Sequence, residues 1–349
     1  MIFPKNILIV RTDRIGDVIL SLPIASVIKK HSPQTKISFL VRDYTKPLAA
    51  NNKFIDETIT LKVENGKIPL VSNVAKLKNK FDACIVAYPT FKIALILFLA
   101  GIKTRIGTGY RWYSFLFNKK VYDHRKYGER HELEYNIRLL AQLGITENVN
   151  EENVEFGIVP SKENSEKVKS ELMSLGLSFT KPIVIIHPGS GGSSIDLPVH
   201  KMKKIIEALS KENVETVITG SADEKELRQS LVVNNSNGII INSAGKFDLE
   251  NLMALIDLSD IMIANSTGPI HIAAALGKHV VGFYPKISSC APKRWGPYTN
   301  KKMIFSPTID CSNCTRKQCE RLNCMESISV DEVSNAVKNI LQQISAEKR

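Results

Sequence analysis

The sequence predicts an α/β protein built from two Rossmann-like domains with parallel sheets, and three observations support this. Short apolar runs alternate with helix-like segments through most of the 349 residues, which is the pattern of strand–helix–strand units. The alternation stops and restarts across residues 146–182, a polar stretch rich in Glu and Asn. The chain is also long enough for two separate hydrophobic cores. We therefore expect two α/β domains with a cleft between them.

Composition places the chain among globular proteins. Hydrophobic residues make up 43% of it and charged residues 23%, which excludes a disordered or fibrous protein. The longest apolar stretch, Ile93 to Ile102, is about half of what a bilayer span requires. The N-terminal run Ile7 to Val10 is far too short for a signal-peptide core. We expect a cytoplasmic protein, and contact with a membrane surface stays open.

The net charge indicates an anionic partner. The formal charge is +12, and residues 1–160 hold 24 Lys and Arg against 15 Asp and Glu, which gives 24 − 15 = +9. The remainder carries 23 − 20 = +3. An excess of this size favours nucleic acid, a membrane surface or a phosphorylated substrate. Most of the excess lies in the first half of the chain.

The first strand, Asn6 to Val10, runs into a loop, residues 11–17, that we interpret as part of a site. A helix carrying apolar residues from Val18 to Ile28 is expected to follow the loop. Two arginines, two aspartates and Gly16 fall within these seven residues. A solvated loop and a plain helix cap at Asp17 are the alternatives, but polar residues gathered at the carboxyl end of a strand favour a site.

Two later segments of the first half are expected to be core. Phe91 to Leu99 is apolar on all sides, which predicts a buried helix. Residues 110–120 mix aromatic and basic side chains, which would suit anionic lipid or nucleic acid. Core packing is the preferred interpretation for most of these aromatic residues.

The second half contains two loops that suit an anion. Residues 260–285 read as strand, polar elbow, helix and strand, with Pro269 fitting the first helical turn. The N–H groups and the dipole of that helix favour phosphate, although Ser266 and Thr267 could be ordinary caps. The loop His187 to Ser194 (HPGSGGSS) lacks the Walker pattern but offers several N–H groups and hydroxyls, if it is not a flexible turn. Because both loops end strands of one domain, they could meet on one diphosphate.

Four cysteines near the C-terminus have the spacing of a tetrahedral thiolate site. Cys311, Cys314, Cys319 and Cys324 follow the C-x2-C-x4-C-x4-C spacing of a zinc knuckle, with Cys319 in the place of the usual histidine. A structural zinc ion, two disulfides and four free thiols all fit this pattern. Cys84 and Cys290 are expected to be ordinary buried or isolated thiols.

Several short motifs, in order along the chain, resemble glycosyltransferase family nine, the heptosyltransferase family of lipopolysaccharide core synthesis. They are Ile7–Asp17 (ILIVRTDRIGD), Arg105–Gly107 (RIG), His187–Gly192 (HPGSGG), Asn265–Leu276 (NSTGPIHIAAAL) and Arg294–Pro297 (RWGP). The resemblance implies the GT-B fold, in which two Rossmann-like domains face each other across a cleft. It also implies inverting transfer of a sugar from a nucleotide-diphosphate donor without a catalytic metal.

The resemblance assigns roles to residues of both halves. Asp17 would be the general base, with Asp13 as the alternative base, and Arg11 and Arg14 would receive an anionic acceptor. The donor-binding set would be Ser190, Gly191, Gly192, Ser266, Thr267, Gly268 and His271. Residues 1–160 would then form the acceptor domain, 161–328 the nucleotide-sugar domain with the cysteine-rich segment 311–324, and 329–349 a C-terminal helix.

The implied donor is ADP-heptose, and the implied acceptor is an anionic glycolipid at the cytoplasmic face of the inner membrane. No cofactor is expected for catalysis. Two positions depart from the family pattern. Ile195 stands where family members often have a donor-contacting lysine, so Lys201 or Lys246 could take that role. Ser266 stands where characterised heptosyltransferases tend to have an acidic residue that binds the sugar, which bears on the identity of the sugar.

Two other functions are weighed against this one. A nucleic-acid-binding protein would use the positive charge and the cysteine knuckle, but the charge excess is remote from the cysteines and no aromatic residue lies among them. We therefore expect no nucleic acid. A nucleotide-sugar-binding protein without catalysis is the other alternative, because the family lysine is missing.

Overall fold

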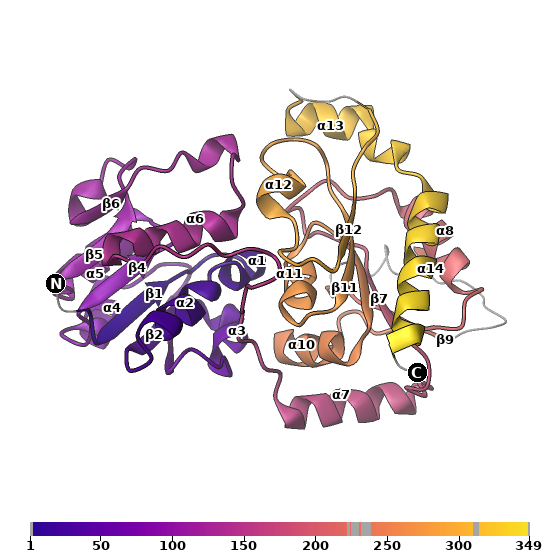
Figure 1. Cartoon of the computed structure of the whole chain (residues 1–349), viewed down its shortest axis with the longest axis horizontal. Coiled ribbons are helices and arrows are strands. Elements are labelled where there is room, and N and C mark those ends of the chain that lie inside the picture. Colours follow the sequence, from indigo (N-terminus) through magenta and orange to yellow (C-terminus); the bar gives the residue numbers. More distant parts are fainter. Residues whose placement is uncertain (1–2, 222–223, 225–229, 232–238, 310–313, 348–349) are drawn as a thin grey trace. The chain divides into compact units, whose positions relative to one another are not determined.

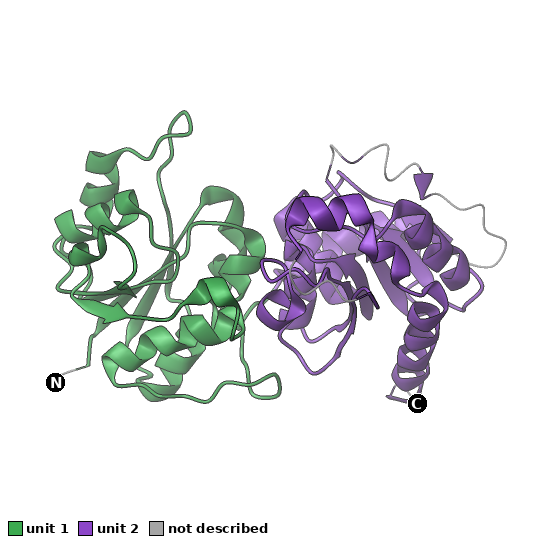
Figure 2. Ribbon diagram, turned by 90° about the horizontal axis from the view of Figure 1, so that it is seen from above, with its two compact units in different colours: residues 1–159 green, residues 160–349 purple. Residues whose placement is uncertain are grey.

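Each half of the chain folds around a parallel β-sheet covered by helices (Figure 1). The computed structural model describes residues 3–221, 224, 230–231, 239–309 and 314–347. The chain divides after Val159 into unit 1, residues 1–159, and unit 2, residues 160–349 (Figure 2). Both sheets consist of parallel pairs, as the alternation of strands and helices predicts.

The sheet of unit 1 has the strand order β3-β2-β1-β4-β5-β6 among the described residues. Its strands are β1 (Asn6–Val10), β2 (Lys36–Val41), β3 (Glu57–Thr60), β4 (Ala83–Val86), β5 (Thr104–Thr108) and β6 (Lys119–Val121). This is the Rossmann order, and it reverses direction between β1 and β4. Val10, the last residue of β1, pairs with Leu40 on one side and Val86 on the other.

Most helices of unit 1 lie in the connections between these strands, and the last three helical segments follow β6. The helices are α1 (Ile15–Ile19), α2 (Pro23–His31), α3 (Pro47–Ala50), α4 (Leu70–Leu77), α5 (Phe91–Leu99), α6 (Glu132–Arg138) and the 3-10 turns η1 (Asp43–Thr45), η2 (Ser114–Leu116), η3 (Arg125–Tyr127) and η4 (Leu139–Leu143). The single helix expected after the first loop is wrong. It is two helices, because Pro23 has no N–H to continue α1 and instead begins α2.

The helix expected over Phe91 to Leu99 forms as α5, but the expectation that it is buried on all sides is wrong. Ile93 and Leu97 are buried, but Phe98 is 48% exposed and Leu99 46% exposed. The following aromatic segment divides in the same way. Tyr113, Leu116 and Phe117 join the core, whereas core packing is the wrong interpretation for Tyr110, Trp112 and Phe115, which are exposed.

Unit 2 repeats the architecture with the strand order β12-β11-β10-β7-β8-β9 among the described residues. Its strands are β7 (Ile183–His187), β8 (Glu215–Ile218), β9 (Ile239–Asn242), β10 (Ile261–Asn265), β11 (His279–Phe283) and β12 (Lys302–Phe305). Taken in chain order, this is again the Rossmann arrangement, with its reversal between β7 and β10. The strand and helix expected over 260–285 form β10, α11 and β11.

The described helices of unit 2 include the connecting helix expected after Pro160. They are α7 (Lys162–Ser174), α8 (Val199–Leu209), α10 (Leu249–Leu258), α11 (Gly268–Ala275), α12 (Pro292–Trp295), α13 (Arg316–Leu322), η6 (Cys324–Ser327) and α14 (Val330–Glu347). A further helix predicted from Asp223 begins outside the described residues.

The C-terminal helix α14 closes the core of unit 2. Its residues Val333, Val337, Ile340 and Ile344 recur at helical spacing, and all four are buried in the cluster that contains the apolar face of α8. No helix in the described ranges is both long enough and apolar enough to cross a bilayer.

Candidate functional site

The first candidate site lies at the strand reversal of unit 1, where β1 ends. Arg11 follows β1 and is only 2% exposed. Its guanidinium donates to Asp13 Oδ1 at 2.7 Å, to Glu132 Oε1 at 3.3 Å and to Asp17 Oδ1. One buried cation therefore gathers three carboxylates of the described chain, and we call Arg11, Asp13, Asp17 and Glu132 the Arg11 cluster.

The charges of the Arg11 cluster shift the proton affinities of its members. Burial alone would lower the pKa of Arg11, but Asp17, Asp13 and Glu132 together raise it, so the guanidinium stays charged. Burial raises the pKa of Asp13 to about 6, against the opposing effect of Arg11 and with a further increase from Asp17. Arg125 supplies a second cation, at 2.5 Å from Glu132 Oε1.

Asp17 combines a fixed orientation with access to solvent. It lies in the first turn of α1, its carboxylate is held by Arg11, and its side chain is 16% exposed. The N-cap of α1 is Arg14, so the plain-cap alternative for Asp17 is wrong. A carboxylate that is held in place and still reachable can accept a proton from a bound hydroxyl.

The sequence analysis assigned both Arg11 and Arg14 to acceptor binding, but the structure places the two side chains in different environments. Arg14 is exposed at the start of α1, whereas Arg11 is buried among carboxylates. Arg11 therefore contacts the Asp17 carboxylate directly. Sequence reasoning missed Glu132, which lies 121 residues from Arg11. The available signal was its place in the first turn of α6, after the N-cap His131, whose Nδ1 accepts from Leu133 N at 3.2 Å.

The second candidate site lies at the strand reversal of unit 2. We call His187–Ser194 the glycine loop and Asn265–Pro269 the elbow. They follow neighbouring strands, since His187 pairs with Ala264. The fully buried Asn265 donates through Nδ2 to Pro188 O and accepts through Oδ1 from Leu197 N at 2.8 Å.

A further hydrogen bond joins the two loops. Ser193 Oγ donates to Ser266 O at 3.0 Å. Asn265 spans the glycine loop, because it bonds one residue inside its start and three residues beyond its end. The structure therefore brings together the two loops that the sequence singled out separately.

The glycine loop contains a tight turn that glycine makes possible. Gly191 has φ +55° and Gly192 has φ +75°, and Ser193 N donates to Ser190 O at 3.0 Å across them. A Cβ at either position would meet no described atom within 4 Å, so this part of the loop is open. At Gly189 a Cβ would lie 1.7 Å from Glu224 Oε1, so a larger residue there would displace the end of the Glu224 side chain.

The elbow differs from an ordinary helix cap. Thr267 is the N-cap of α11, yet its hydroxyl makes no capping hydrogen bond to the described backbone. The Thr267 hydroxyl and the first-turn N–H groups of α11 are groups of the kind that can bind an anion at a helix start. Behind them His271 is buried in the first turn of α11. The capping interpretation of Thr267 is thus wrong for its side chain.

Sequence reasoning also missed a cation at the glycine loop. Arg316 of α13 donates through Nη1 to Gly192 O at 3.0 Å and through Nη2 to Ser194 O at 2.9 Å. Its Nε is held by Glu320 at 2.9 Å. The sequence signal was weak, because Arg316 lies among cysteines, 124 residues from Gly192, and nothing in that segment indicates which residue it contacts.

Two lysines were considered as replacements for the family lysine that is missing at Ile195, and they lie in different environments. Lys201 donates to Ile328 O at 2.8 Å and lies 3.6 Å from Glu326. Lys246 is exposed beyond β9. Ile195 itself packs against the main apolar core of unit 2 and against the cysteines.

His187, the residue that begins the glycine loop, has a structural role. His187 is buried and its Nδ1 lies 2.9 Å from Thr219 Oγ1. Burial lowers its pKa to about 4, although Glu224 opposes the change. His187 is therefore neutral near pH 7 and fixes the start of the loop rather than charging it.

The cysteines form an apolar cluster beside the glycine loop. Cys319 and Cys324 are buried with Ile287, and Cys290 and Cys314 pack against them. The five described cysteines are unbridged, and no group of three or more metal-ligating side chains of the described residues could hold an ion. Cys311 lies outside the described residues. Cys84 and Cys290 were expected to be ordinary buried or isolated thiols; Cys84 is buried, and Cys290 is an unbridged, half-buried thiol that packs against the cluster.

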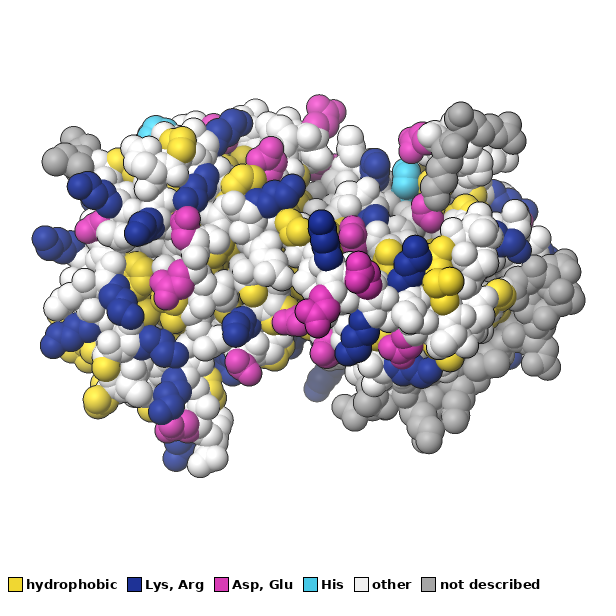
Figure 3. Space-filling model, turned by 90° about the horizontal axis from the view of Figure 1, so that it is seen from below, with side chains coloured by type: hydrophobic (Ala, Val, Ile, Leu, Met, Phe, Trp, Pro, Cys, Tyr) yellow, Lys and Arg dark blue, Asp and Glu magenta, His cyan; other side chains and the backbone are white. Residues whose placement is uncertain are grey.

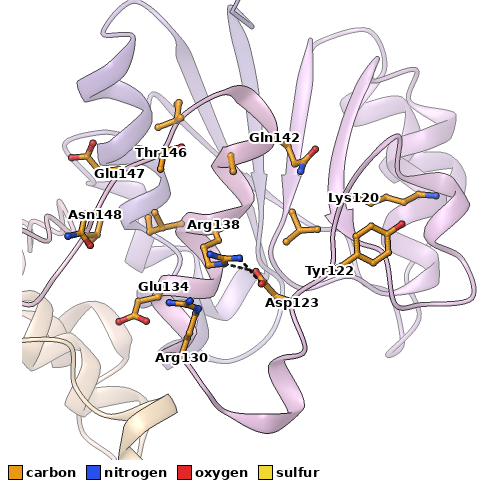
Figure 4. A pocket seen from close by; sticks show the side chains of 15 residues that line it. Lys120, Tyr122, Asp123, Arg130, Glu134, Arg138, Gln142, Thr146, Glu147 and Asn148 are labelled. Carbon is orange, nitrogen blue, oxygen red and sulfur yellow. Dashed lines mark hydrogen bonds and ion pairs between the residues drawn. The ribbon is translucent and has the colours of Figure 1, made fainter.

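Unit 1 also contains a cavity of about 700 Å³ beside β6, α6 and η4 (Figure 4). Charged residues of both signs line it, and Arg138 and Asp123 pair there at 3.0 Å. None of the site residues predicted from the sequence lines this cavity.

Comparison with known proteins gives the class of the protein. The model of glycosyltransferase family 9 (heptosyltransferase) matches residues 72–325. A Haemophilus influenzae protein named as a glycosyltransferase is 30% identical and covers 97% of this chain and 98% of its own length. The crystal structure of the family 9 glycosyl transferase from Veillonella parvula has a TM-score of 0.82 at 21% identity, with 97% of both chains covered. Escherichia coli ADP-heptose lps heptosyltransferase II has a TM-score of 0.77 at 20% identity, with 97% of this chain and 99% of that chain covered.

Two Rossmann-type units, each with polar loops at its strand reversal, define a GT-B-type glycosyltransferase fold. The chain belongs to glycosyltransferase family 9.

The raised pKa of Asp13 gives a first prediction. Because the pKa of Asp13 is about 6 in the folded protein and 3.8 unperturbed, the folded state binds a proton that the unfolded state does not bind between these pH values. Asp13 therefore adds stability as the pH falls from about 6 to 4, and this contribution is lost as the pH rises through about 6. The Asp13→Asn variant should lack this rise.

Urea unfolding of the wild type and of Asp13→Asn at several pH values measures the effect. The difference in unfolding free energy between the two proteins should change by roughly 1–3 kcal/mol across this window. Asp43→Asn, an exposed carboxyl of unit 1, serves as the control and should leave the pH dependence intact. A pH-independent difference between wild type and Asp13→Asn would contradict the assignment.

Asn265 gives a second prediction. Asn265→Ala leaves Pro188 O and Leu197 N without their partner. It weakens the link between the glycine loop and the elbow, where the hydrogen bond from Ser193 to Ser266 remains. ADP binding, measured by titration calorimetry, should weaken by about tenfold, and the free energy of unfolding should fall by roughly 1–3 kcal/mol.

The matched control is Asn73→Ala in unit 1. Asn73 is also buried and also bonds backbone on both sides, at Lys62 and Pro69. It should destabilise the protein by a similar amount and leave ADP affinity unchanged. If the two variants changed the affinity for ADP equally, the geometry of the glycine loop would have no specific part in ADP binding.

Proposed function

We propose that this protein transfers a sugar, with heptose favoured, from a nucleotide-diphosphate donor to an anionic glycolipid acceptor, with inversion at the anomeric carbon. The observation that carries the proposal is the pairing of the open glycine loop with the elbow through Asn265, at the strand reversal of unit 2. Open α/β sheets bind nucleotides at this position. In this proposal unit 2 is the donor domain and unit 1 the acceptor domain.

The donor diphosphate would lie on backbone amides. Gly191 and Gly192 supply the backbone N–H groups of an open turn, and Thr267 and Gly268 begin a helix whose positive dipole end favours phosphate. Ser190 and Ser266 line the same two loops, with His271 behind them. When the sugar–phosphate bond breaks, negative charge grows on the departing diphosphate, and these donors stabilise it without reorganisation.

Arg316 would supply the cation that the family lysine supplies elsewhere. It holds two carbonyls of the glycine loop and brings a guanidinium to the loop edge. Ile195 occupies the lysine position but packs on apolar groups, so the positive charge arrives from α13 instead. Amides and a guanidinium at the leaving group are the basis on which we propose catalysis without a metal.

Asp17 would be the general base. It accepts the proton of the acceptor hydroxyl as that oxygen forms its bond to the anomeric carbon and the bond from that carbon to the phosphate oxygen breaks. Arg11 orients the Asp17 carboxylate, and Asp13 and Glu132 hold Arg11. Arg14, exposed at the start of α1, would attract the acceptor's anionic groups.

The names of the relatives support the choice of donor and acceptor. The Escherichia coli structure is named for ADP-heptose and lps. We propose ADP-heptose as donor, lipopolysaccharide core as acceptor, and the cytoplasmic face of the inner membrane as the place of reaction. The excess positive charge of residues 1–160 suits that acceptor, and Figure 3 shows many Lys and Arg side chains over unit 1, at the left of the picture.

The third prediction tests Asp17. Asp17→Asn keeps the shape of the side chain but cannot take the proton, so kcat should fall by about 10²- to 10⁴-fold while donor affinity stays within about twofold. Sugar transfer from ADP-heptose to lipopolysaccharide core is assayed together with ADP-heptose binding. Asp43→Asn is the surface control and should retain full activity.

Two outcomes would contradict this assignment, and a third would contradict the reaction itself. Full turnover of Asp17→Asn would remove it as the base. A larger loss in Asp13→Asn than in Asp17→Asn would transfer the role to Asp13. Donor binding without turnover in the unmodified chain would identify a binding protein that lacks catalysis.

The fourth prediction tests Arg316. Arg316→Ala removes two hydrogen bonds to the glycine loop and a positive charge beside the diphosphate, so the Kd for ADP should rise by roughly tenfold or more. Arg316→Lys should recover part of the affinity, because it restores the charge but not the paired contact.

Arg321→Ala is the matched control for Arg316, since Arg321 is exposed on the same short helix. It should bind ADP as the wild type does. If Arg316→Ala and Arg321→Ala bound ADP equally well, the guanidinium at the loop would have no part in donor binding.

A further inference from the structure

One continuous part of unit 1 carries positive charge with no opposing charge in its sequence. Residues 83–122 contain no Asp and no Glu. Their cations are Lys92, Lys103, Arg105, Arg111, Lys119 and Lys120. A surface helix or loop of a soluble protein normally mixes both signs, so this one-sided segment indicates an anionic partner.

The same segment exposes large apolar side chains. Helix α5 carries Phe91, Leu95, Phe98 and Leu99 at positions that share one helical face. Phe91 is 38% exposed, Phe98 48% and Leu99 46%, and Leu95 is half-buried. The opposite face, with Ile93 and Leu97, packs in the core. Helix α5 is therefore apolar on the side that it turns away from the sheet.

The loop around η2 extends this apolar face. Trp112 is 73% exposed and stacks on Phe91 with ring centroids 4.8 Å apart. Phe115, in η2, is 67% exposed. Tyr113 anchors the loop beneath them, because its hydroxyl donates to Pro89 O at 2.7 Å.

Arg105 joins the other end of the helix to the loop. Its guanidinium lies 5.1 Å from the ring of Phe98, and its Nε donates to Leu116 O at 2.7 Å. The exposed side chains thus form one surface rather than scattered residues. We call it the aromatic–basic surface, and it consists of Phe91, Lys92, Phe98, Leu99, Lys103, Arg105, Arg111, Trp112 and Phe115.

This surface begins beside the Arg11 cluster. Arg11 donates to Ala87 O at 3.4 Å, at the carboxyl end of β4, and its guanidinium lies 5.8 Å from the ring of Tyr88. Phe91 is four residues after Ala87, so their Cα atoms are at most about 14 Å apart. A molecule held on the surface would therefore be close to Asp17.

We propose that the aromatic–basic surface docks unit 1 on an anionic lipid bilayer. Trp and Phe insert at the level of the headgroups, and lysine and arginine side chains pair with lipid phosphates. Docking depends on the composition of the surface and does not require the proposed reaction. It adds to that reaction a place where the sugar of a lipid-linked acceptor would meet Asp17 while its acyl chains stay in the membrane.

The composition of the surface favours lipid over other anionic partners. Nucleic acid would stack its bases on exposed aromatic rings. On helix α5, the aliphatic side chain of Leu99 and the ring edge of Phe98 lie on one face and add apolar area that stacked bases would leave uncovered. A second copy of this chain would bring the same positive charge to the contact and be repelled. A bilayer satisfies both the apolar and the charged groups at once.

The fifth prediction uses the two tryptophans of the chain, Trp112 and Trp295. Trp295→Phe leaves Trp112 as the reporter. Vesicles of phosphatidylglycerol and phosphatidylcholine in equal parts should shift its fluorescence to shorter wavelength, and brominated acyl chains should quench it. Vesicles of phosphatidylcholine alone should do much less, and raised salt should weaken the effect.

Two variants of the full chain test the surface by vesicle co-sedimentation. Trp112→Ala with Phe115→Ala removes apolar area, and Lys92→Glu with Lys103→Glu reverses two charges. Each pair should lower the apparent affinity for the mixed vesicles by about tenfold or more. The matched controls are Met173→Ala with Leu175→Ala, two exposed apolar residues of unit 2, and Lys204→Glu on α8. Both controls should bind as the wild type does.

Several outcomes would overturn the docking proposal. They are unchanged Trp112 fluorescence with anionic vesicles, equal loss in the control variants, tighter binding to an oligonucleotide than to vesicles, or a dimer that the surface variants dissociate. Circular dichroism melting separates these from unfolding, because the replaced side chains are exposed and Tm should stay within a few degrees.

A soluble acceptor distinguishes this proposal from the proposed reaction. With a deacylated core oligosaccharide, the surface variants should keep wild-type turnover, and with acceptor in vesicles they should lose it. If the protein bound vesicles but transferred no sugar to either acceptor, the proposed reaction would be refuted and the docking proposal would stand. If all variants transferred the sugar equally well to both acceptors, the docking proposal would be refuted and the proposed reaction would stand.

Discussion

The reversal of strand order in each parallel sheet is the constraint on which both candidate sites depend. Where neighbouring strands lead their helices to opposite faces, the loops at their carboxyl ends diverge and leave room for a ligand. In unit 1 this position lies between β1 and β4, and Arg11 bridges it by contacting the loop after β4. In unit 2 it lies between β7 and β10, and Asn265 bridges it. The same topology thus holds a carboxylate in one unit and amide donors in the other.

The two reversals differ in their electrostatics, and this difference gives them different chemistry. In unit 1 one guanidinium is surrounded by carboxylates, and burial makes the proton of Asp13 easier to retain. Such a site suits proton transfer. In unit 2 the groups gathered at the reversal are glycines, hydroxyls and the start of a helix, with Arg316 at the edge. Such a site suits a diphosphate, because its donors are fixed before the ligand arrives.

Patterns local in sequence predicted most of the fold and part of each site. Buried parallel strands are continuous apolar runs, so β1, β2, β4, β7 and β10 were recognisable, and Asp17, the glycine loop and the elbow follow such runs. Partners distant in sequence were not predictable. Glu132 and Arg316 lie more than a hundred residues from the groups they hold, and nothing near them indicates the contact. The interpretation of α5 as buried failed because apolar periodicity cannot show whether an outer face is covered.

A crystal structure of the protein with ADP-heptose bound tests the central claim most directly. The account predicts the diphosphate within hydrogen-bonding distance of the amides of Gly191, Gly192, Thr267 and Gly268, with Arg316 at the loop edge and the Asp17 carboxylate facing the anomeric carbon. A diphosphate bound elsewhere, or an anomeric carbon turned away from Asp17, would contradict it.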